Sequence, residues 1–206
     1  MTSRDVDRAV SELGVRRVVD LRGSRWGASG PLGDDGRGVG IDFFALAGPP
    51  VDEEGSSRDG FLPGLLDRAG PVVGLVLEQL VTTDGATLVH CHTGKDRTGF
   101  VIALTLSLVG VSNEDVVADY DRSTPIFETM MRNLEASGRS VPAEAPAYAL
   151  HPPSAAGARA MLDRLDTEWG GAHAYLLAVG VDAELLDRAR SRLRDDRADD
   201  RADDRA

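Results

Sequence analysis

The decapeptide His90-Cys91-His92-Thr93-Gly94-Lys95-Asp96-Arg97-Thr98-Gly99 constrains the fold more than any other part of this chain. A short, β-branched apolar run at 87–89 precedes it, and a longer apolar run at 100–104 follows it. The first run predicts a buried strand, and the second predicts a buried helix. The loop between them therefore ends at a helix N-terminus, where free backbone N–H groups and the positive end of the helix dipole attract anions.

The residue types in this loop suit a phosphate group. Gly94 permits the positive φ that lets successive N–H groups curl around an anion, and Arg97 offers a planar fork for two phosphate oxygens. Among these dipoles the Cys91 thiol is expected to ionise more readily than an ordinary cysteine. A thiolate aimed at phosphorus is a nucleophile, so the pattern predicts a phosphocysteine intermediate. The Thr98 hydroxyl can donate to the sulfur, while His90 orders the loop.

Two other interpretations of the decapeptide are weaker. A buried structural cysteine followed by an accidental arginine would explain Cys91 and Arg97, but not the strand-loop-helix context or the glycines. A nucleotide-binding P-loop needs a glycine five positions before Gly94 and a hydroxyl residue directly after the lysine. Those positions hold Val89 and Asp96, which excludes it.

The decapeptide resembles the active-site loop of the cysteine-dependent protein tyrosine phosphatases, in particular a bacterial tyrosine phosphatase family typified by a mycobacterial enzyme. The likeness extends over most of residues 15–194, through Asp20-Leu21-Arg22, Asp119-Tyr120 and the segments 174–177 and 181–185. It implies a single α/β phosphatase domain over 1–194 that needs no metal or cofactor. The implied roles are nucleophile for Cys91, phosphate clamp for Arg97 and substrate binding for the remaining loop residues His92, Thr93, Gly94, Lys95 and Thr98.

Lys95 and Asp96 bear on substrate and acid catalysis. A lysine in the loop adds a second positive charge, which suits substrates with more than one phosphate, and in the resembled family it accompanies activity on inositol lipids. The alternative is that Lys95 points to solvent and balances Asp96. A general acid must protonate the leaving oxygen, and no Trp-Pro-Asp motif precedes the loop. We assign that role to Asp96, as in myotubularin-type phosphatases, with Asp52 as the alternative.

Composition sets the cellular frame. The net charge of −11, from 23 basic and 34 acidic residues, argues against nucleic acid as a partner. One cysteine excludes an internal disulfide. No apolar run approaches the ~20 residues of a membrane span, and the start carries no signal-peptide core. The cytoplasm is the expected location, with export by a signal-less route left open.

The hydrophobic pattern alternates between strands and helices and predicts a mainly parallel central sheet flanked by helices. Strands are expected at 17–21, 41–46 and 87–89, and loops at 22–40, 47–64 and 137–154. Helices are expected at 5–13, 71–81, 100–110, after the Ser112 cap, 125–134, 158–169, 175–179 and 185–193. The repeated Asp-Asp-Arg-Ala tail at 195–206 has no apolar face and is set apart from the domain.

The predicted activity is metal-independent phosphomonoester hydrolysis on a phosphorylated protein. Phosphotyrosine is the expected substrate, with phosphoserine, phosphothreonine or phosphoinositide as alternatives. A catalytically silent phosphate-binding module of the same fold is the rival from another class, although binding alone has no need of a thiol. A sulfur-transfer or arsenate-reducing enzyme is a second rival, but arsenate reduction usually needs further cysteines.

Overall fold

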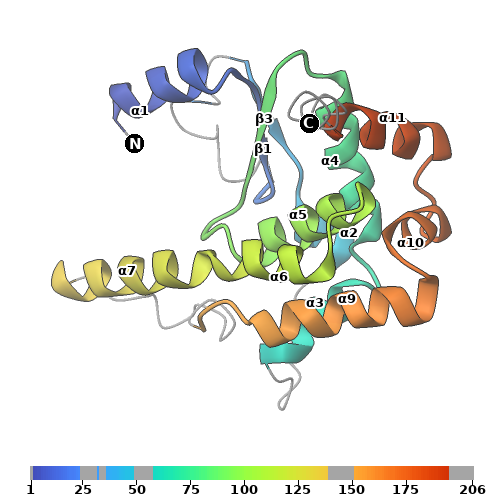
Figure 1. The fold of residues 1–206 in the computed structure, drawn as a ribbon. Helices are drawn as coiled ribbons and strands as arrows, with labels where there is room; N and C mark the ends of the chain where they lie inside the picture. The colour runs from blue at the N-terminus through green and yellow to red at the C-terminus, as the bar shows by residue number, and fades with distance from the viewer. Residues whose placement is uncertain (1, 24–31, 33–35, 49–57, 139–150, 195–206) are drawn as a thin grey trace, which may run out of the picture.

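The computed structural model describes residues 2–23, 32, 36–48, 58–138 and 151–194. Within them a small parallel sheet is flanked by helices (Figure 1). The strands are β1 Val15–Asp20, β2 Gly38–Gly40 and β3 Ala86–His90. Their order in the sheet is β2-β1-β3, and both pairings are parallel. The expected α/β class with a parallel sheet is therefore confirmed.

The helices cover the sheet and extend to one side of it. The N-terminal part holds α1 Ser3–Asp7, the π-helical turn η1 Arg8–Glu12, α2 Phe43–Ala47, the 3-10 turn η4 Arg58–Gly60, α3 Phe61–Leu65 and α4 Gly70–Thr82. The C-terminal part holds α5 Asp96–Leu108, α6 Asn113–Asp121, α7 Ser123–Ala136, α9 Ala155–Trp169, α10 Ala172–Ala178 and α11 Ala183–Leu193. Figure 1 shows α7 continuing the line of α6 away from the sheet.

Short polar side chains start several of these helices. Ser112 accepts a hydrogen bond from the backbone N–H of Asp115 at 3.2 Å, and its hydroxyl donates to the Asp115 carboxylate at 2.8 Å. The expected Ser112 cap of α6 is therefore confirmed, with the carboxylate on the serine hydroxyl instead of on the backbone N–H that a capping box uses. Ser154 and Asp182 cap α9 and α11 through the N–H groups of Gly157 and Leu185. Each cap satisfies a backbone donor that the first helical turn leaves unpaired.

The expected strand at 41–46 is wrong. Residues 38–40 pair with β1, and the chain then turns into α2 because the Asp42 carboxylate accepts the backbone N–H of Ala45 at 3.0 Å. The cap outweighs the β propensity of the two phenylalanines. Phe43 lies in the core, with its ring packed edge-on against Phe100 of α5.

The expected loop at 47–64 needs a second correction. Its last residues form η4 and α3, which place Leu62 and Leu65 in the core. Arg164 of α9 ties α3 down by donating to the Pro63 carbonyl at 2.9 Å and to the Asp67 carboxylate at 2.6 and 3.0 Å. These partners are about 100 positions away, so the local pattern does not reveal them.

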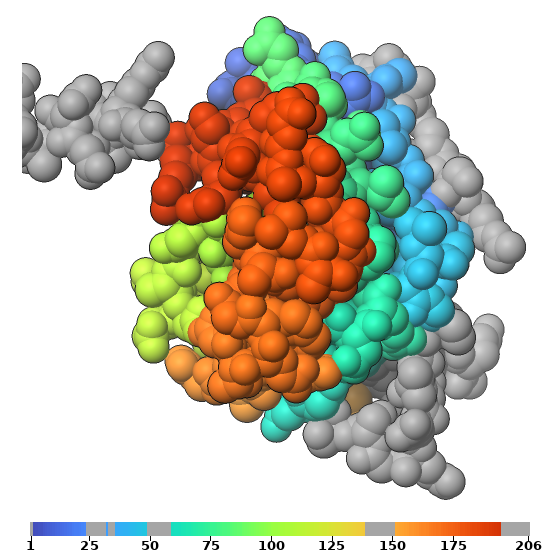
Figure 2. All heavy atoms as spheres, turned by 90° about the vertical axis from the view of Figure 1, so that its right-hand side faces the viewer, coloured from blue at the N-terminus to red at the C-terminus, as the bar shows by residue number. Residues whose placement is uncertain are grey.

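The C-terminal helices form one continuous layer. Figure 2 shows α9, α10 and α11 side by side in orange to red on this face of the molecule. Tyr175 of α10 is fully buried, and its hydroxyl donates to the Leu66 carbonyl at 2.8 Å. The helices expected around 158–169, 175–179 and 185–193 are thus confirmed. No helix among the described residues is long and apolar enough to cross a membrane.

Candidate active site

Cys91 lies where the carboxyl end of β3 meets the N-terminus of α5. Strand β3 ends at His90 and helix α5 begins at Asp96, so five residues make the turn between them. Cys91 is 6% exposed, whereas His92 and Gly94 of the same loop are exposed. Gly94 has φ +73°, and a Cβ on it would meet no atom within 4 Å. Backbone conformation rather than crowding therefore favours glycine here, as the sequence predicts.

The guanidinium of Arg97 is held by two contacts. Arg97 stands in the first turn of α5, and its Nη1 donates to the Leu21 carbonyl at 3.3 Å. Its guanidinium also lies over the ring of Phe44 in α2, 5.0 Å from the centroid. A guanidinium carries five N–H donors, so these contacts orient the group while using only part of its capacity. The carbonyl and the ring come from segments 53 or more residues away in the sequence.

The Asp20 carboxylate, at the end of β1, lies close to His90, the residue that precedes Cys91. The carboxylate of Asp20, a residue that is 1% exposed, accepts from Nε of Arg22 at 2.9 and 3.0 Å and from Nη2 at 2.6 Å. The backbone N–H of Arg22 donates to it at 2.9 Å, and Nε2 of His90 lies 3.9 Å away. The other ring nitrogen of His90 is 3.1 Å from the Cys91 carbonyl. His90 thus bridges β1 and the loop, in keeping with an ordering role.

This network shifts two pKa values in opposite directions. Burial raises the pKa of Asp20, but the side-chain and backbone hydrogen bonds from Arg22 lower it further, so the net pKa lies below the ordinary value. The hydrogen bonds to Asp20 raise the pKa of Arg22. A smaller electrostatic contribution from Cys91 also raises the pKa of Arg22. Both partners are therefore ionised at neutral pH.

Lys95 lies in the interior rather than in solvent. The residue is 1% exposed, and its ammonium lies 4.5 Å from the centroid of the Phe127 ring of α7. The same ammonium donates to the His151 carbonyl and lies 3.7 Å from Oδ2 of Asp96. The solvent-facing alternative is therefore wrong. Asp96 is itself 4% exposed. The two charged residues of the loop form an ion pair at the start of α5.

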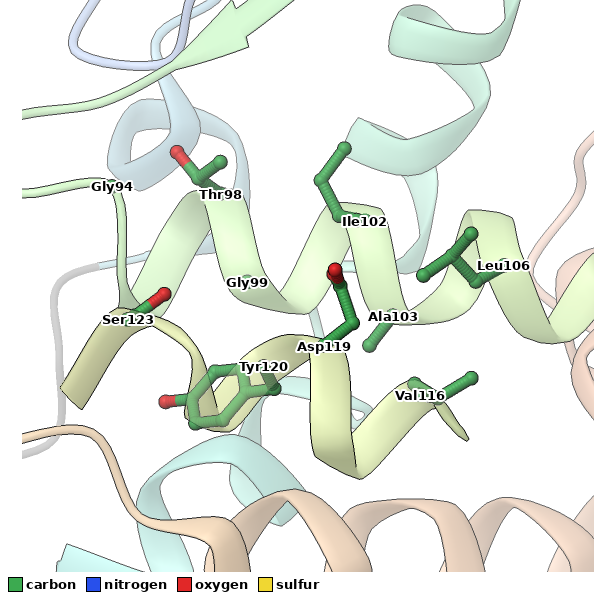
Figure 3. Close-up of a pocket in the computed structure, with 10 residues that line it drawn as sticks. All are labelled: Gly94, Thr98, Gly99, Ile102, Ala103, Leu106, Val116, Asp119, Tyr120 and Ser123. Carbon is green, nitrogen blue, oxygen red and sulfur yellow. The ribbon is translucent and has the colours of Figure 1, made fainter. Parts of the chain in front are cut away.

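A cavity of about 120 Å³ lies between α5 and α6 (Figure 3). Gly94, Thr98 and Gly99 line it from one side, and Asp119 and Tyr120 line it from the other. The Thr98 hydroxyl is buried without a hydrogen-bond partner among the described residues. Gly99 lies against the Tyr120 ring, since a Cβ at this position would fall 2.4 Å from Cε2. The cavity therefore lies beside the loop and is lined by Thr98, whose hydroxyl is expected to donate to the Cys91 sulfur.

The structure therefore brings most of the predicted site residues together. Cys91, Arg97, Asp96 and Thr98 all lie within one loop and one helical turn. Asp52, the alternative acid, lies outside the described residues, as does the tail. The described residues hold no cluster of three or more His, Cys, Asp or Glu side chains able to bind a metal ion.

The sequence pattern does not predict two residues that contact the site. Arg22 and Phe44 reach it from the end of β1 and from α2. Arg22 belongs to the Asp-Leu-Arg segment that carries part of the family resemblance, so a signal for it exists. Phe44 lies in the segment predicted as a strand and gives no such signal.

The fold and the site define a class of α/β protein with a cysteine on the loop that ends at a helix N-terminus and an arginine in the first turn of that helix. The model of the tyrosine phosphatase family matches residues 1–195, and this chain belongs to that family. A tyrosine-protein phosphatase from Nostoc commune is 30% identical over 92% of this chain and 70% of its own length. The triple specificity protein phosphatase PtpB of Mycobacterium tuberculosis is 52% identical over 21% of this chain and 16% of its own length. Membership implies a phosphorylated substrate.

Proposed function

We propose that this protein hydrolyses phosphomonoesters through a phosphocysteine formed on Cys91, without the need for a metal ion. The observation that carries the proposal is the placement of the sulfur between the end of β3 and the N-terminus of α5, with Arg97 fixed one turn away. Backbone N–H groups and the guanidinium supply the positive charge that a transferring phosphoryl group needs.

The reaction has two balanced steps. In the first, the Cys91 thiolate attacks phosphorus, the bond from phosphorus to the ester oxygen breaks, and Asp96, which enters this step protonated, gives its proton to the leaving oxygen. The carboxylate that results is the form that pairs with Lys95. In the second, water attacks phosphorus and loses a proton to Asp96. The sulfur–phosphorus bond breaks, which releases inorganic phosphate and the thiolate. The Thr98 hydroxyl, which is buried beside the loop, stabilises the departing sulfur by donating to it.

The direct test is turnover of an aryl phosphate in the presence of a chelator. The parent protein should be active, and Cys91→Ser should lose at least about 10³-fold in rate, because an alcohol lacks the ionised nucleophile. Rapid acid quench of the parent should leave phosphate bound to Cys91. Thr98→Ala should increase the trapped fraction by slowing the second step. Turnover by Cys91→Ser equal to the parent would refute the mechanism.

The rival of a silent phosphate-binding module gives a different result in the same assay. That module would bind inorganic phosphate and protect Cys91 from alkylation, yet release no product from any aryl phosphate. Because the chain has one cysteine, iodoacetamide labelling reports this site alone. Protection without turnover would therefore favour the module over the enzyme.

For the substrate, we propose phosphotyrosine in protein, with phosphoserine, phosphothreonine and phosphoinositides as further candidates. The Mycobacterium tuberculosis relative is a triple specificity protein phosphatase, which supports testing a broad panel of substrates. Lys95 can contact a second phosphate only by giving up its contacts with Phe127 and His151, which favours monophosphorylated substrates. Turnover rates on matched phosphopeptides and on inositol phospholipid vesicles discriminate between these classes.

A further inference from the structure

Two arginines converge on the turn that follows β1. Arg97 of α5 donates to the Leu21 carbonyl at 3.3 Å, and Arg22 is the next residue along that turn. The backbone N–H of Leu21 donates to the His90 carbonyl at 2.8 Å, which continues the ladder beyond the Asp20–His90 pair. The turn at 21–22 therefore runs beside the first residues of the loop that holds Cys91.

Arg22 has little freedom of orientation. Its Nε and Nη2 atoms grip both carboxylate oxygens of Asp20 at 2.6–3.0 Å, and its own N–H donates to the same carboxylate. The Arg22 side chain is 21% exposed and that of Asp20 is 2% exposed. A planar guanidinium fits a carboxylate in this way and a lysine does not. Asp20 therefore determines where the charge of Arg22 lies.

We propose that Arg22, held by Asp20, is a second cation of the active site that stabilises the ionised sulfur of Cys91 and supplements Arg97 in attracting phosphate. The inference deepens the proposed phosphatase function and depends on it for the phosphate part. It is supported by the position of Arg22 in the turn that runs beside His90, the residue before Cys91. Cys91 also contributes, after Asp20, to raising the pKa of Arg22. Arg22 acts through its field and its position.

The charge balance around the sulfur explains why a second cation is needed. The titratable groups around the loop include Asp20 at the end of β1, Arg22 in the turn after it, His90 of β3, His92 and Lys95 of the loop, Asp96 and Arg97 of α5, and Asp119 of α6 across the cavity. Lys95 is paired with Asp96. Without Arg22 the buried carboxylate of Asp20 would oppose ionisation of the sulfur. With Arg22 present the pair presents a dipole instead of a negative charge.

The test follows the rate of iodoacetamide alkylation of Cys91 against pH. Arg22→Gln should move the midpoint of this profile upward by about 0.5–1 pH unit. It should also raise the concentration of inorganic phosphate that gives half-protection by about 2–5-fold, the effect of removing a nearby charge that makes no direct contact with the anion. Arg16→Gln is the matched control, because it removes the same charge from an exposed position of β1, the strand that precedes Arg22. Arg16 lies four residues before Asp20, about 13 Å along the strand, which exceeds the screening length of about 8–10 Å.

Two further variants separate charge from folding. Arg22→Lys keeps the charge, so its alkylation midpoint should stay within about 0.3 pH unit of the parent, while phosphate protection weakens because the fork is lost. Asp20→Asn combined with Arg22→Gln removes both charges and leaves no buried carboxylate without a partner, so it should fold. Its midpoint should lie between those of the parent and Arg22→Gln. Thermal unfolding of each variant identifies any that fail to fold.

The outcomes are distinguishable from failure of the phosphatase function. A midpoint and a half-protection concentration in Arg22→Gln equal to those of Arg16→Gln would overturn the inference, and if Arg22→Gln does not fold, the double variant decides by the same comparison. Neither readout requires turnover. Absence of aryl phosphate hydrolysis by the parent would count against the phosphatase proposal, whereas a shifted midpoint would still support the role of Arg22 at the sulfur.

Discussion

Substitution of Gly99 by alanine tests the contact between α5 and α6 behind the active-site loop. A Cβ at this position would lie 2.4 Å from Cε2 and 2.8 Å from Cδ2 of Tyr120. The Tyr120 ring has little room to move, because the residue is 5% exposed and packs in the core. Either the ring or the helix must therefore shift.

The magnitude follows from two opposing contributions to the free energy of unfolding. Replacing a helical glycine by alanine stabilises a protein by about 0.5–1 kcal/mol. Overpacking a filled core costs about 1–3 kcal/mol. Gly99→Ala should therefore be neutral to about 2 kcal/mol less stable than the parent. Gly64→Ala is the matched control, since Gly64 lies in α3 and a Cβ there meets no atom within 4 Å. It should keep the favourable contribution alone.

Urea unfolding at neutral pH measures the difference, which should be about 1–3 kcal/mol between the two alanine variants. For a chain of this length each kcal/mol corresponds to about 2–4 °C in Tm. Combining Gly99→Ala with Tyr120→Leu should cost less than the sum of the single changes, because the ring that causes the clash is gone. The packing argument is refuted if Gly99→Ala is as stable as Gly64→Ala.

Three further predictions concern the charged residues of the site. Asp96→Asn should slow hydrolysis of poor leaving groups by about 10²–10⁴-fold and of activated aryl phosphates much less; equal losses would indicate a structural role, and Asp52→Asn would then be compared in the same way. Lys95 is the single lysine of the chain and is 1% exposed. An amine-specific acylating reagent should therefore modify its side chain at least about tenfold more slowly than the exposed model amine N-acetyl-lysine amide. A comparable rate would contradict the buried position. The pKa of Asp20 lies below the ordinary value of 3.8. The ionised carboxylate therefore contributes to stability above about pH 5, and this contribution is lost as the pH falls below 3.8. The urea midpoints of the parent and Asp20→Asn should differ at pH 6 and converge toward pH 3.

The conformation of the loop that holds Cys91 is predictable from sequence because it depends on adjacent residues. A β-branched run, a glycine and a long apolar run fix the strand, the turn and the helix in adjacent residues, and β3, Gly94 and α5 agree with that expectation. The caps of α6 and the positions of the C-terminal helices follow from equally local patterns.

The remainder depends on contacts between distant residues. The pair Phe43-Phe44 has the composition of a strand, but the Asp42 cap turns it into a helix whose rings pack on α5 and under Arg97. A lysine in a polar loop is expected to face solvent, yet Phe127 and the His151 carbonyl hold the Lys95 ammonium in the interior. Residue spacing within the loop does not reveal that Phe127 and His151 are the partners of Lys95.

The Leu21 carbonyl that receives Arg97 shows that a ten-residue signature is not a self-sufficient catalyst. The same peptide placed between another strand and helix would keep its thiol and its backbone N–H groups. Its guanidinium would lack the backbone acceptor that the turn after β1 provides, and so would not be held in one orientation. A search for enzymes of this kind would therefore be more selective if it required both halves, an Asp-Leu-Arg strand end and a cysteine loop, in adjacent parallel strands.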